Sequence, residues 1–411
     1  MLTKGWDTIS IVKLERINSD LAGVWAGVDS HFSYTSSKPE VHINGLFACW
    51  SIIEGGGGRI LRLKLPIQSG EITLGQTKVN LENTSAIIEI TLSLLPSQNN
   101  ITVLKSEYQN LAKNRSEMIP ETNGWVLPIT FLDSGGKVGA LSNVVLDSIC
   151  KYLISNPKQF ELIFAEISFA KSGSPTWAIP QKCAYSYLDS GYLAILSVCS
   201  DKNISQLPLD VDITGISLGA SSFYVMSSEL MLKNLILPGL ADIYQNCSSD
   251  CFFFRDREFL NREDLRLHEI KSGAIYYTPI VYKEMNIARA EGDRIMVCYN
   301  GKCDMYVGIA MYWNGNVKMN ALLDTQGSIS FYQNGRDFSH TVDIPWYLKW
   351  LSPIVGVIVT IVVSVISDDL IKSIESRSSS ISANKINTVT WCKNQAVVKS
   401  VYVSESLIFE Y

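Results

Sequence analysis

The feature that most restricts the fold is a two-residue alternation of apolar side chains between residues 295 and 331. A long set of apolar residues falls on odd-numbered positions: Ile295, Val297, Tyr299, Met305, Val307, Ile309, Met311, Trp313, Val317, Met319, Ala321, Leu323, Ile329 and Phe331. Successive side chains of a β-strand point to opposite faces, so this pattern predicts antiparallel strands that share one apolar face.

Two Asn-Gly pairs interrupt this alternation, at Asn300-Gly301 and Asn314-Gly315. A two-residue turn would send the next apolar set to the opposite face, whereas a three-residue turn keeps it on the same face. The pattern therefore predicts bulged three-residue turns at 299–301 and 313–315. Cys303 would then face Val297 with Cys298 on the other face, which argues against a disulfide between the two cysteines.

The rest of the chain alternates between strand patterns and a few helical ones. Apolar spacings of three and four predict helices near 14–28, 141–156, 226–243 and 344–377, the third interrupted at Pro238-Gly239. Glycines 55–58 precede a strand rather than a helix, so they predict a hairpin loop and not a phosphate-binding loop. This order, rich in strands and without βαβ alternation, predicts an α+β fold.

Composition excludes several functional classes. Hydrophobic residues make up 46% of the 411 residues and charged residues 18%, which excludes a disordered chain. The net charge of −5, without any Lys/Arg-rich run, disfavours a nucleic-acid partner. Only four histidines occur, and Cys247 and Cys251 lack the closer spacing of structural zinc ligands, so no metal site is predicted. The expectation is free thiols and no cofactor.

The N-terminus and the cysteines bear on localisation. Residues 1–7 lack the apolar core of a secretory signal peptide. Nine cysteines, an odd number, suit a reducing compartment. We therefore expect synthesis in the cytoplasm without a signal peptide, and release by another route stays open.

The most apolar segment is 350–367, which contains no charged residue. As a helix it would span about 27 Å, close to the thickness of a bilayer core. The apolar pattern continues beyond Asp368-Asp369 through Leu370, Ile371 and Ile374, as one face of a longer helix. We favour a helix buried along the apolar sheet. A transmembrane span and a segment that inserts only after a trigger are the alternatives.

One enzymatic motif is present. Gly215-Ile216-Ser217-Leu218-Gly219 matches the G-x-S-x-G elbow of serine hydrolases, in which the serine sits between a strand and a helix. Asp264 with His268, or Asp337 with His340, would follow in the required order. No oxyanion motif precedes Ser217, and no helix is predicted directly after it. A serine esterase acting through Ser217 is therefore the alternative function rather than the preferred one.

Several motifs together resemble a known family. They are Gly5-Trp6-Asp7, Ile17-Asn18, Trp50-Ser51-Ile52-Ile53 before the glycines, Leu61–Ile67 with Gly70, Ile88-Glu89-Ile90, and Pro345-Trp346 before the late helix. Their order and spacing over most of the chain resemble the clostridial P-forty-seven family, encoded beside botulinum neurotoxin in orfX-type gene clusters. One departure is Tyr347, where a second tryptophan-like aromatic would be expected.

The resemblance implies a tubular lipid-binding (TULIP) fold, with long helices along a strongly curved antiparallel sheet. The whole chain, 1–411, would be one elongated unit that could divide into two lobes near 1–220 and 221–411. The implied function is a non-catalytic accessory protein of a toxin complex that binds lipid or a membrane surface, with other toxin-cluster proteins as further candidate partners. The expected lipid-binding residues line a groove between the late helix and the sheet: Val307, Ile309, Met311, Met319, Leu323, Trp346, Trp350, Val355 and Val359.

Overall fold

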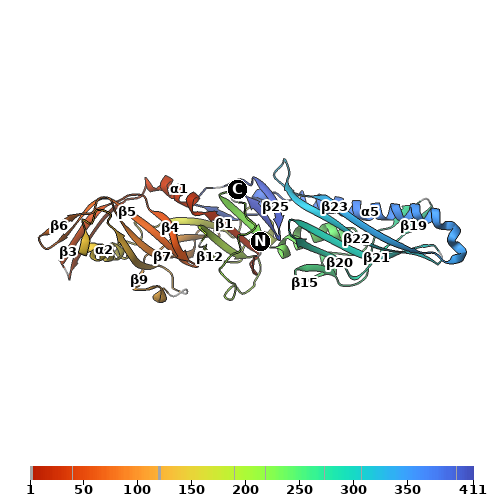
Figure 1. Cartoon of the computed structure of the whole chain (residues 1–411), viewed down its shortest axis with the longest axis horizontal. Coiled ribbons are helices and arrows are strands. Elements are labelled where there is room, and N and C mark those ends of the chain that lie inside the picture. Colours follow the sequence, from red (N-terminus) through yellow and green to blue (C-terminus); the bar gives the residue numbers. More distant parts are fainter. Residues whose placement is uncertain are drawn as a thin grey trace.

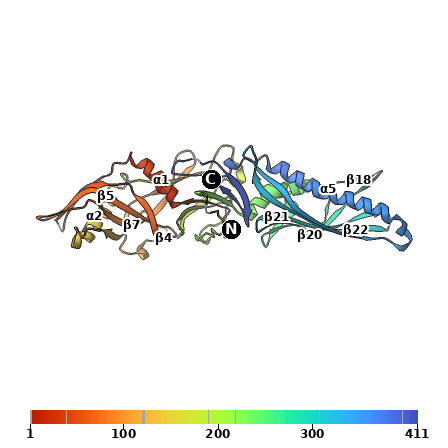
Figure 2. The same cartoon turned by 45° about the horizontal axis from the view of Figure 1, so that its top comes forward.

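The molecule is elongated, and the two halves of the chain occupy opposite ends. The computed structural model describes residues 3–38, 40–118, 122–188, 190–217, 219–272, 274–306, 308–394 and 396–411. Figure 1 shows the first half of the chain at one end, the later strands and the long helix at the other, and both termini in the middle. Figure 2 shows the same arrangement after a turn about the long axis.

A six-stranded sheet in the middle joins the two halves. Its order is β12-β13-β1-β14-β26-β25. The bounds are β1 Thr8–Lys13, β12 Lys182–Leu188, β13 Tyr192–Val198, β14 Ser222–Met226, β25 Ser400–Ser404 and β26 Ser406–Glu410. The first half supplies β12, β13 and β1, and the second supplies the rest. The antiparallel β1–β14 pair therefore joins the two halves through backbone hydrogen bonds.

The sheet of the first half has eleven strands, with the order β2-β3-β5-β7-β8-β11-β24 and four further strands paired beside it. The bounds are β2 His31–Ser37, β3 Glu40–Phe47, β4 Ser51–Gly57, β5 Ile60–Leu74, β6 Thr77–Asn80, β7 Thr84–Pro96, β8 Ile101–Ser106, β9 Asn110–Leu111, β10 Trp125–Leu132, β11 Ile163–Ser168 and β24 Val389–Trp391. Helices α1 (Leu14–Trp25) and α2 (Ser142–Ser155) bury their apolar faces in the core of this half. The predicted hairpin between β4 and β5 is confirmed, but Gly55–Gly57 belong to β4 and only Gly58 and Arg59 form the turn.

The sheet of the second half has seven strands, with the order β15-β16-β20-β21-β22-β23 and β17 paired to β20. The bounds are β15 Phe252–Arg255, β16 Glu258–Asn261, β17 Leu265–Arg266, β20 Ile280–Glu291, β21 Arg294–Tyr306, β22 Ile309–Leu323 and β23 Ile329–Asp343. A separate hairpin pairs β18 (Ile270–Ser272) with β19 (Ile275–Tyr277). Short 3₁₀ turns cover Arg115–Glu117, Gly139–Leu141, Thr176–Ala178, Ser249–Cys251, Trp346–Leu351 (η6) and Ala383–Lys385 (η7).

The helices of the second half agree with the predicted ones. The helix α5 covers Ser352–Ser378, and residues 228–242 form α3 (Ser228–Met231), a π-helical stretch Leu232–Ile236 and α4 (Leu237–Asp242). The predicted interruption at Pro238 is confirmed as this π-helical stretch just before it. Since proline has no backbone N–H and its ring crowds the preceding turn, a regular α-helix cannot continue through that position.

The predicted turns at 299–301 and 313–315 are wrong. Strands β21 and β22 run through both Asn-Gly pairs, which lie opposite each other: Tyr299 pairs with Gly315, and Gly301 pairs with Trp313. An uninterrupted strand preserves the odd-numbered apolar face as well as a three-residue turn does. A β-carbon on Gly315 would lie 2.5 Å from Tyr299 Cε2, so glycine here makes room for a ring rather than a turn.

The register also corrects the predicted partner of Cys303. Cys303 lies opposite Met311 rather than Val297, and Cys298 lies opposite Asn316. Cys303 is buried on the odd-numbered face, and Cys298 is on the even-numbered one. All nine cysteines fall within the described residues and carry free thiols.

The fold class is mixed α+β with mostly antiparallel sheets, as predicted; among the described pairs, β9–β10 is parallel. The expected strong curvature of the sheet is not observed. Bulges are the usual means of bending a sheet, and the β21–β22 pairing runs from Ile295 to Asp304 without one. A helix rather than sheet closure covers the apolar face.

Candidate functional site

The apolar face predicted from the odd-numbered residues is present. On β21, β22 and β23, the buried odd-numbered side chains include Ile295, Val297, Tyr299, Ile309, Met311, Trp313, Val317, Met319, Ile329 and Phe331. Their even-numbered neighbours are more exposed, as Tyr312 shows with 45% of its surface accessible. This face belongs to one hydrophobic cluster that also contains residues of α4 and α5.

Helix α5 covers this face. Its described buried side chains include Val355, Val359, Ile366, Leu370 and Ile374, spaced by four or seven residues along one side of the helix. Figure 2 shows α5 running lengthwise beside the strands of this half. The described side chains therefore place α5 as a buried helix along the sheet, the arrangement predicted for it.

Polar contacts tie α5 to its neighbours at a few points. The Tyr299 hydroxyl and Ser367 Oγ are 3.1 Å apart, and both side chains are buried. Nearer the C-terminal end, the Arg377 guanidinium donates to the two carboxylate oxygens of Asp242 at 2.7 and 3.1 Å, which holds α5 to the end of α4. These ties leave most of the contact between α5 and the sheet apolar.

A glycine allows α4 to approach α5 closely. A β-carbon on Gly239 would lie 2.6 Å from the Cα atom of Ile374, so any side chain there would push the two helices apart. This close packing and the Arg377–Asp242 pair both lie towards the C-terminal end of α5. Both contacts connect α5 to α4.

The structure brings together part of the predicted lipid-binding set. Ile309, Met311, Met319, Val355 and Val359 are buried in one cluster, and Leu323 packs against it half-buried. Val307 lies outside the described residues, as does the side chain of Trp350. Trp346 does not join the cluster, because η6 directs it outward with 82% of its surface exposed.

A polar cavity of about 370 Å³ opens beside α5. It is lined by Asp242, Ile243, Leu267, His268, Glu269, Ile270, Ile366, Asp369, Lys372, Ser373, Ser376 and Arg377. Sequence reasoning missed this group because its members are far apart in the chain; Asp242 and Arg377 are separated by 135 positions. The cavity combines an apolar floor with charges of both signs at its rim.

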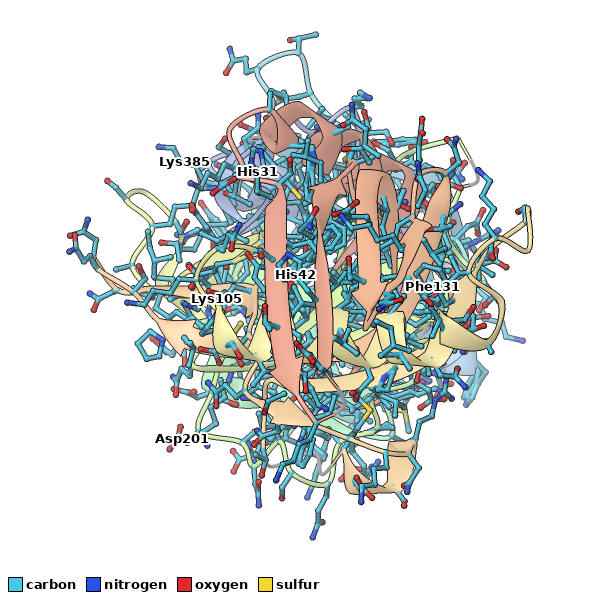
Figure 3. All side chains as sticks on the ribbon, turned by 90° about the vertical axis from the view of Figure 1, so that its left-hand side faces the viewer. His31, His42, Lys105, Phe131, Asp201 and Lys385 are labelled. Carbon is cyan, nitrogen blue, oxygen red and sulfur yellow. The ribbon has the colours of Figure 1, made fainter. Side chains whose placement is uncertain are left out.

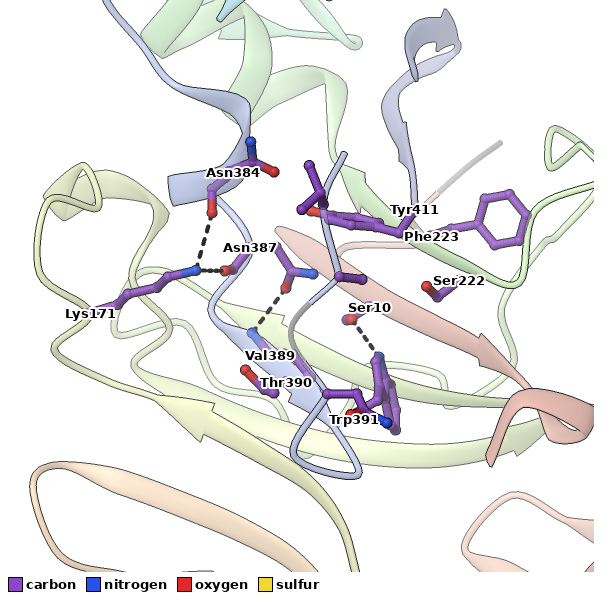
Figure 4. A pocket seen from close by; sticks show the side chains of 13 residues that line it. Ser10, Lys171, Ser222, Phe223, Asn384, Asn387, Val389, Thr390, Trp391 and Tyr411 are labelled. Carbon is purple, nitrogen blue, oxygen red and sulfur yellow. Dashed lines mark hydrogen bonds between the residues drawn. The ribbon is translucent and has the colours of Figure 1, made fainter. Parts of the chain in front are cut away.

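A second cavity, of about 170 Å³, lies at the junction of the two halves (Figure 4). The Lys171 amine donates there to the main-chain oxygens of Asn384 and Asn387, at 3.2 and 2.7 Å. Burial lowers the pKa of this amine. Trp391 donates to Ser10 Oγ at 3.1 Å. These bonds connect segments of the chain to each other, so the cavity is best explained as part of the junction.

The geometry around Ser217 is not that of a nucleophile elbow. Ser217 is exposed in the loop before β14, and a strand rather than a helix follows. Its Oγ accepts the Gly219 N–H at 3.2 Å, and its own N–H donates to the Tyr402 hydroxyl at 3.4 Å. A serine hydrolase would instead need a histidine as the partner of this Oγ.

The described bonds of the histidines involve other groups. His31 Nδ1 lies 2.9 Å from Asp29, and His42 Nδ1 lies 2.9 Å from Thr35. Figure 3 shows both histidines at the end of the molecule formed by the first half. His268 contacts the main-chain oxygen of Asp242 beside α5. None of these three contacts involves Ser217.

Comparison with known proteins identifies the family. A family model described as "OrfX-like: Protein OrfX2/OrfX3/P47" matches residues 3–401. The chain belongs to this OrfX-like family. The resemblance drawn from the sequence motifs is thereby confirmed over nearly the whole chain.

Individual relatives of this OrfX-like chain are distant in sequence. Protein P47 of Clostridium botulinum (strain Kyoto / Type A2) is 23% identical over 313 residues, which cover 73% of this chain and 72% of that protein. Protein OrfX3 of Paraclostridium bifermentans is 22% identical over 275 residues, covering 59% of this chain and 55% of that protein.

Two solved structures share the fold of the OrfX-like chain. P47 from Clostridium botulinum A2 superposes with a TM-score of 0.75 at 21% identity, over 99% of this chain and 97% of that one. P47 of Clostridium botulinum E1 superposes with a TM-score of 0.76 at 21% sequence identity, over 99% of this chain and 98% of that one. At this identity the likeness establishes the fold.

The described residues of the OrfX-like chain form neither a membrane-spanning helix nor a metal-binding cluster. Among its described residues, no helix has both the length and the apolar character that crossing a bilayer requires. Within the same part of the chain, no group of three or more His, Cys, Asp or Glu residues is arranged to hold a metal ion.

Proposed function

We propose that this OrfX-like protein is a non-catalytic lipid-binding accessory protein of a toxin gene cluster. Its apolar ligand would lie between α5 and the odd-numbered face of β21–β23. The observation that carries the proposal is that helices, with α5 the longest, rather than a second sheet cover a sheet face built almost entirely of apolar side chains. A helix is a cover that can shift without breaking the hydrogen bonds of the sheet.

The distribution of contacts along α5 supports an opening for such a ligand. The Arg377–Asp242 ion pair and the close glycine contact at Ile374 lie near its C-terminal end, and Asp368 pairs with Arg336 of β23 at 3.5 Å in the same half of the helix. Nearer its start, Val355 and Val359 are held by apolar contacts, while Gly356 and Val357 face solvent. An acyl chain entering near the start of α5 would exchange apolar contacts between helix and sheet for apolar contacts between protein and ligand. This exchange costs little hydrophobic free energy.

The TULIP assignment, the toxin-cluster partners and the localisation belong to the same proposal. Membership of the OrfX-like family supports the role beside toxin proteins. We expect one elongated unit, since the six-stranded sheet continues from one half into the other. Synthesis in the cytoplasm, with release alongside the toxin complex, remains the expected route.

A fluorescent fatty acid tests the acyl site directly. Wild-type protein is expected to bind the probe saturably, and unlabelled fatty acid should displace it. Met311→Gln places an amide of similar size in the buried face and should weaken binding about tenfold, because the amide would be desolvated against the acyl chain. Tyr312→Ser changes the next residue, which points to the opposite face, and should bind as the wild type does.

Two results would contradict the proposal. One is the absence of saturable binding by the wild-type protein; the other is equal binding by the Met311→Gln and Tyr312→Ser variants while both remain folded. A fluorophosphonate probe separates the enzymatic alternative. Labelling that disappears in a Ser217→Ala variant would establish a serine hydrolase, and we expect no such labelling.

A further inference from the structure

The outer end of the second half exposes aromatic side chains that the proposed acyl site does not use. Trp346 is 82% exposed and Tyr347 57% exposed, although both are large and apolar. Their rings form a T-shaped pair with centroids 5.8 Å apart. They belong to η6, which Figure 1 shows leading into α5 at the narrow outer end of the molecule.

A second segment with exposed apolar side chains lies beside α5. The β18–β19 hairpin exposes Ile275 and Tyr276, which are 46% and 57% accessible. The Lys271 amine lies 5.6 Å from the centre of the Tyr276 ring. Figures 1 and 2 both show the hairpin beside α5 in the outer half of the molecule. Sequence reasoning missed the hairpin because its strands are only three residues long.

The chemistry of these side chains favours one kind of partner. Trp and Tyr rings concentrate at the headgroup level of bilayers, where an apolar ring and a polar edge are both accommodated. A lysine beside them can lie along the apolar surface and reach lipid phosphates with its amine. A stable protein interface buries about 800 Å² on each partner. The four partly exposed side chains Trp346, Tyr347, Ile275 and Tyr276 supply less than that, since a whole aromatic side chain has only about 150–250 Å².

We propose that this outer end, formed by Trp346, Tyr347 and the β18–β19 hairpin, docks end-on into the interface of a lipid bilayer. The inference rests on the proposed lipid function and adds which part of the molecule contacts the bilayer. The start of α5, where the acyl site would open, directly follows η6. Docking at this end would bring the opening to the membrane while the rest of the molecule stays in water.

Sedimentation with vesicles tests the proposal, using equal parts of phosphatidylcholine and phosphatidylserine. The Trp346→Ser/Tyr347→Ser variant should lose about tenfold or more in vesicle partitioning, because two rings leave the apolar region. The control is Tyr312→Ser/Tyr332→Ser, which removes two half-exposed rings (45% and 42%) from the side of the same sheet. This control variant should partition as the wild type does.

Three outcomes would overturn the docking proposal. The first is equal partitioning of both double variants. The second is a wild-type protein that binds the soluble fatty acid but does not sediment with vesicles, which would leave the acyl site standing. The third is a wild-type protein that is dimeric in solution while the Trp346→Ser/Tyr347→Ser variant is monomeric. This result would make the outer end a protein interface. A wild-type protein that binds neither the fatty acid nor the vesicles would contradict the proposed function as well as the docking proposal.

Discussion

Glu89 on β7 shows how single residues hold the sheet of the first half together. Its carboxylate is fully buried and accepts hydrogen bonds from Arg62 Nη2 at 2.8 Å and from Arg115 Nε at 2.7 Å. Burial alone would raise the pKa of this carboxyl, but the two guanidiniums outweigh it and keep the pKa below its ordinary value. Gly55 leaves the space for the Arg62 guanidinium, since a β-carbon there would lie 2.1 Å from Arg62 Nη1.

Glu89→Gln is expected to destabilise the protein by about 3 kcal/mol at pH 7, because it removes the fully buried negative charge that holds the half-buried Arg62 and the more exposed Arg115 together. Urea unfolding measures the difference. Since the pKa is lowered in the folded state, the wild-type advantage should be complete above about pH 5 and shrink as the pH falls further. Glu161→Gln, which breaks a more exposed pair with Lys105, should cost less than about 1 kcal/mol. If Glu89→Gln and Glu161→Gln lowered the free energy of unfolding equally, the proposed role of Glu89 between Arg62 and Arg115 would be wrong.

Glycine positions in the apolar sheet make a second test at this scale. Gly315→Ala is expected to cost about 1–3 kcal/mol, because its β-carbon would overlap the Tyr299 ring. Gly335→Ala in the neighbouring strand β23 meets nothing closer than 3.6 Å, so it should be neutral or stabilising by up to about 1 kcal/mol. Thermal unfolding of the two variants compares them. If Gly335→Ala were the more harmful, the proposed role of Gly315 would be wrong.

At the scale of elements, α5 is the critical case. Val359 is 3% exposed and Val357 is 61% exposed on the same helix. Val359→Asp should cost about 3 kcal/mol or more, because it buries an unpaired carboxylate, while Val357→Asp should change stability by no more than about 0.5 kcal/mol. If Val359→Asp proved as stable and soluble as Val357→Asp, α5 would not pack on the sheet.

The same elements show what the sequence could and could not predict. The odd-numbered face was predictable because strand periodicity depends on neighbouring residues alone. The turn positions were not, since Asn300-Gly301 is consistent both with a turn and with a strand whose glycine lies against the Ile280 main chain and the Trp313 ring. The buried side of α5 followed from spacing, but the outward direction of Trp346 depends on the 3₁₀ turn that precedes the helix.

At the scale of the whole molecule, the two halves of the chain meet in the six-stranded sheet, and β24 of the second half also pairs with β11 of the first. In the first half, α1 and α2 pack into one hydrophobic core. In the second half, α4 and α5 pack into another. The β1–β14 pair connects them, but its paired residues are 210 to 218 positions apart, so no local pattern predicts it. The family assignment, by contrast, was available from motif order, because motifs need no knowledge of distant contacts.

The measurement that tests the account most directly is photocrosslinking with a diazirine-bearing fatty acid, followed by peptide mapping of the intact protein. We predict label on α5 and on the β21–β23 residues that face it, reduced by unlabelled fatty acid. Label confined to the first half, or label that unlabelled fatty acid does not displace, would contradict the claim that α5 and this sheet enclose the ligand.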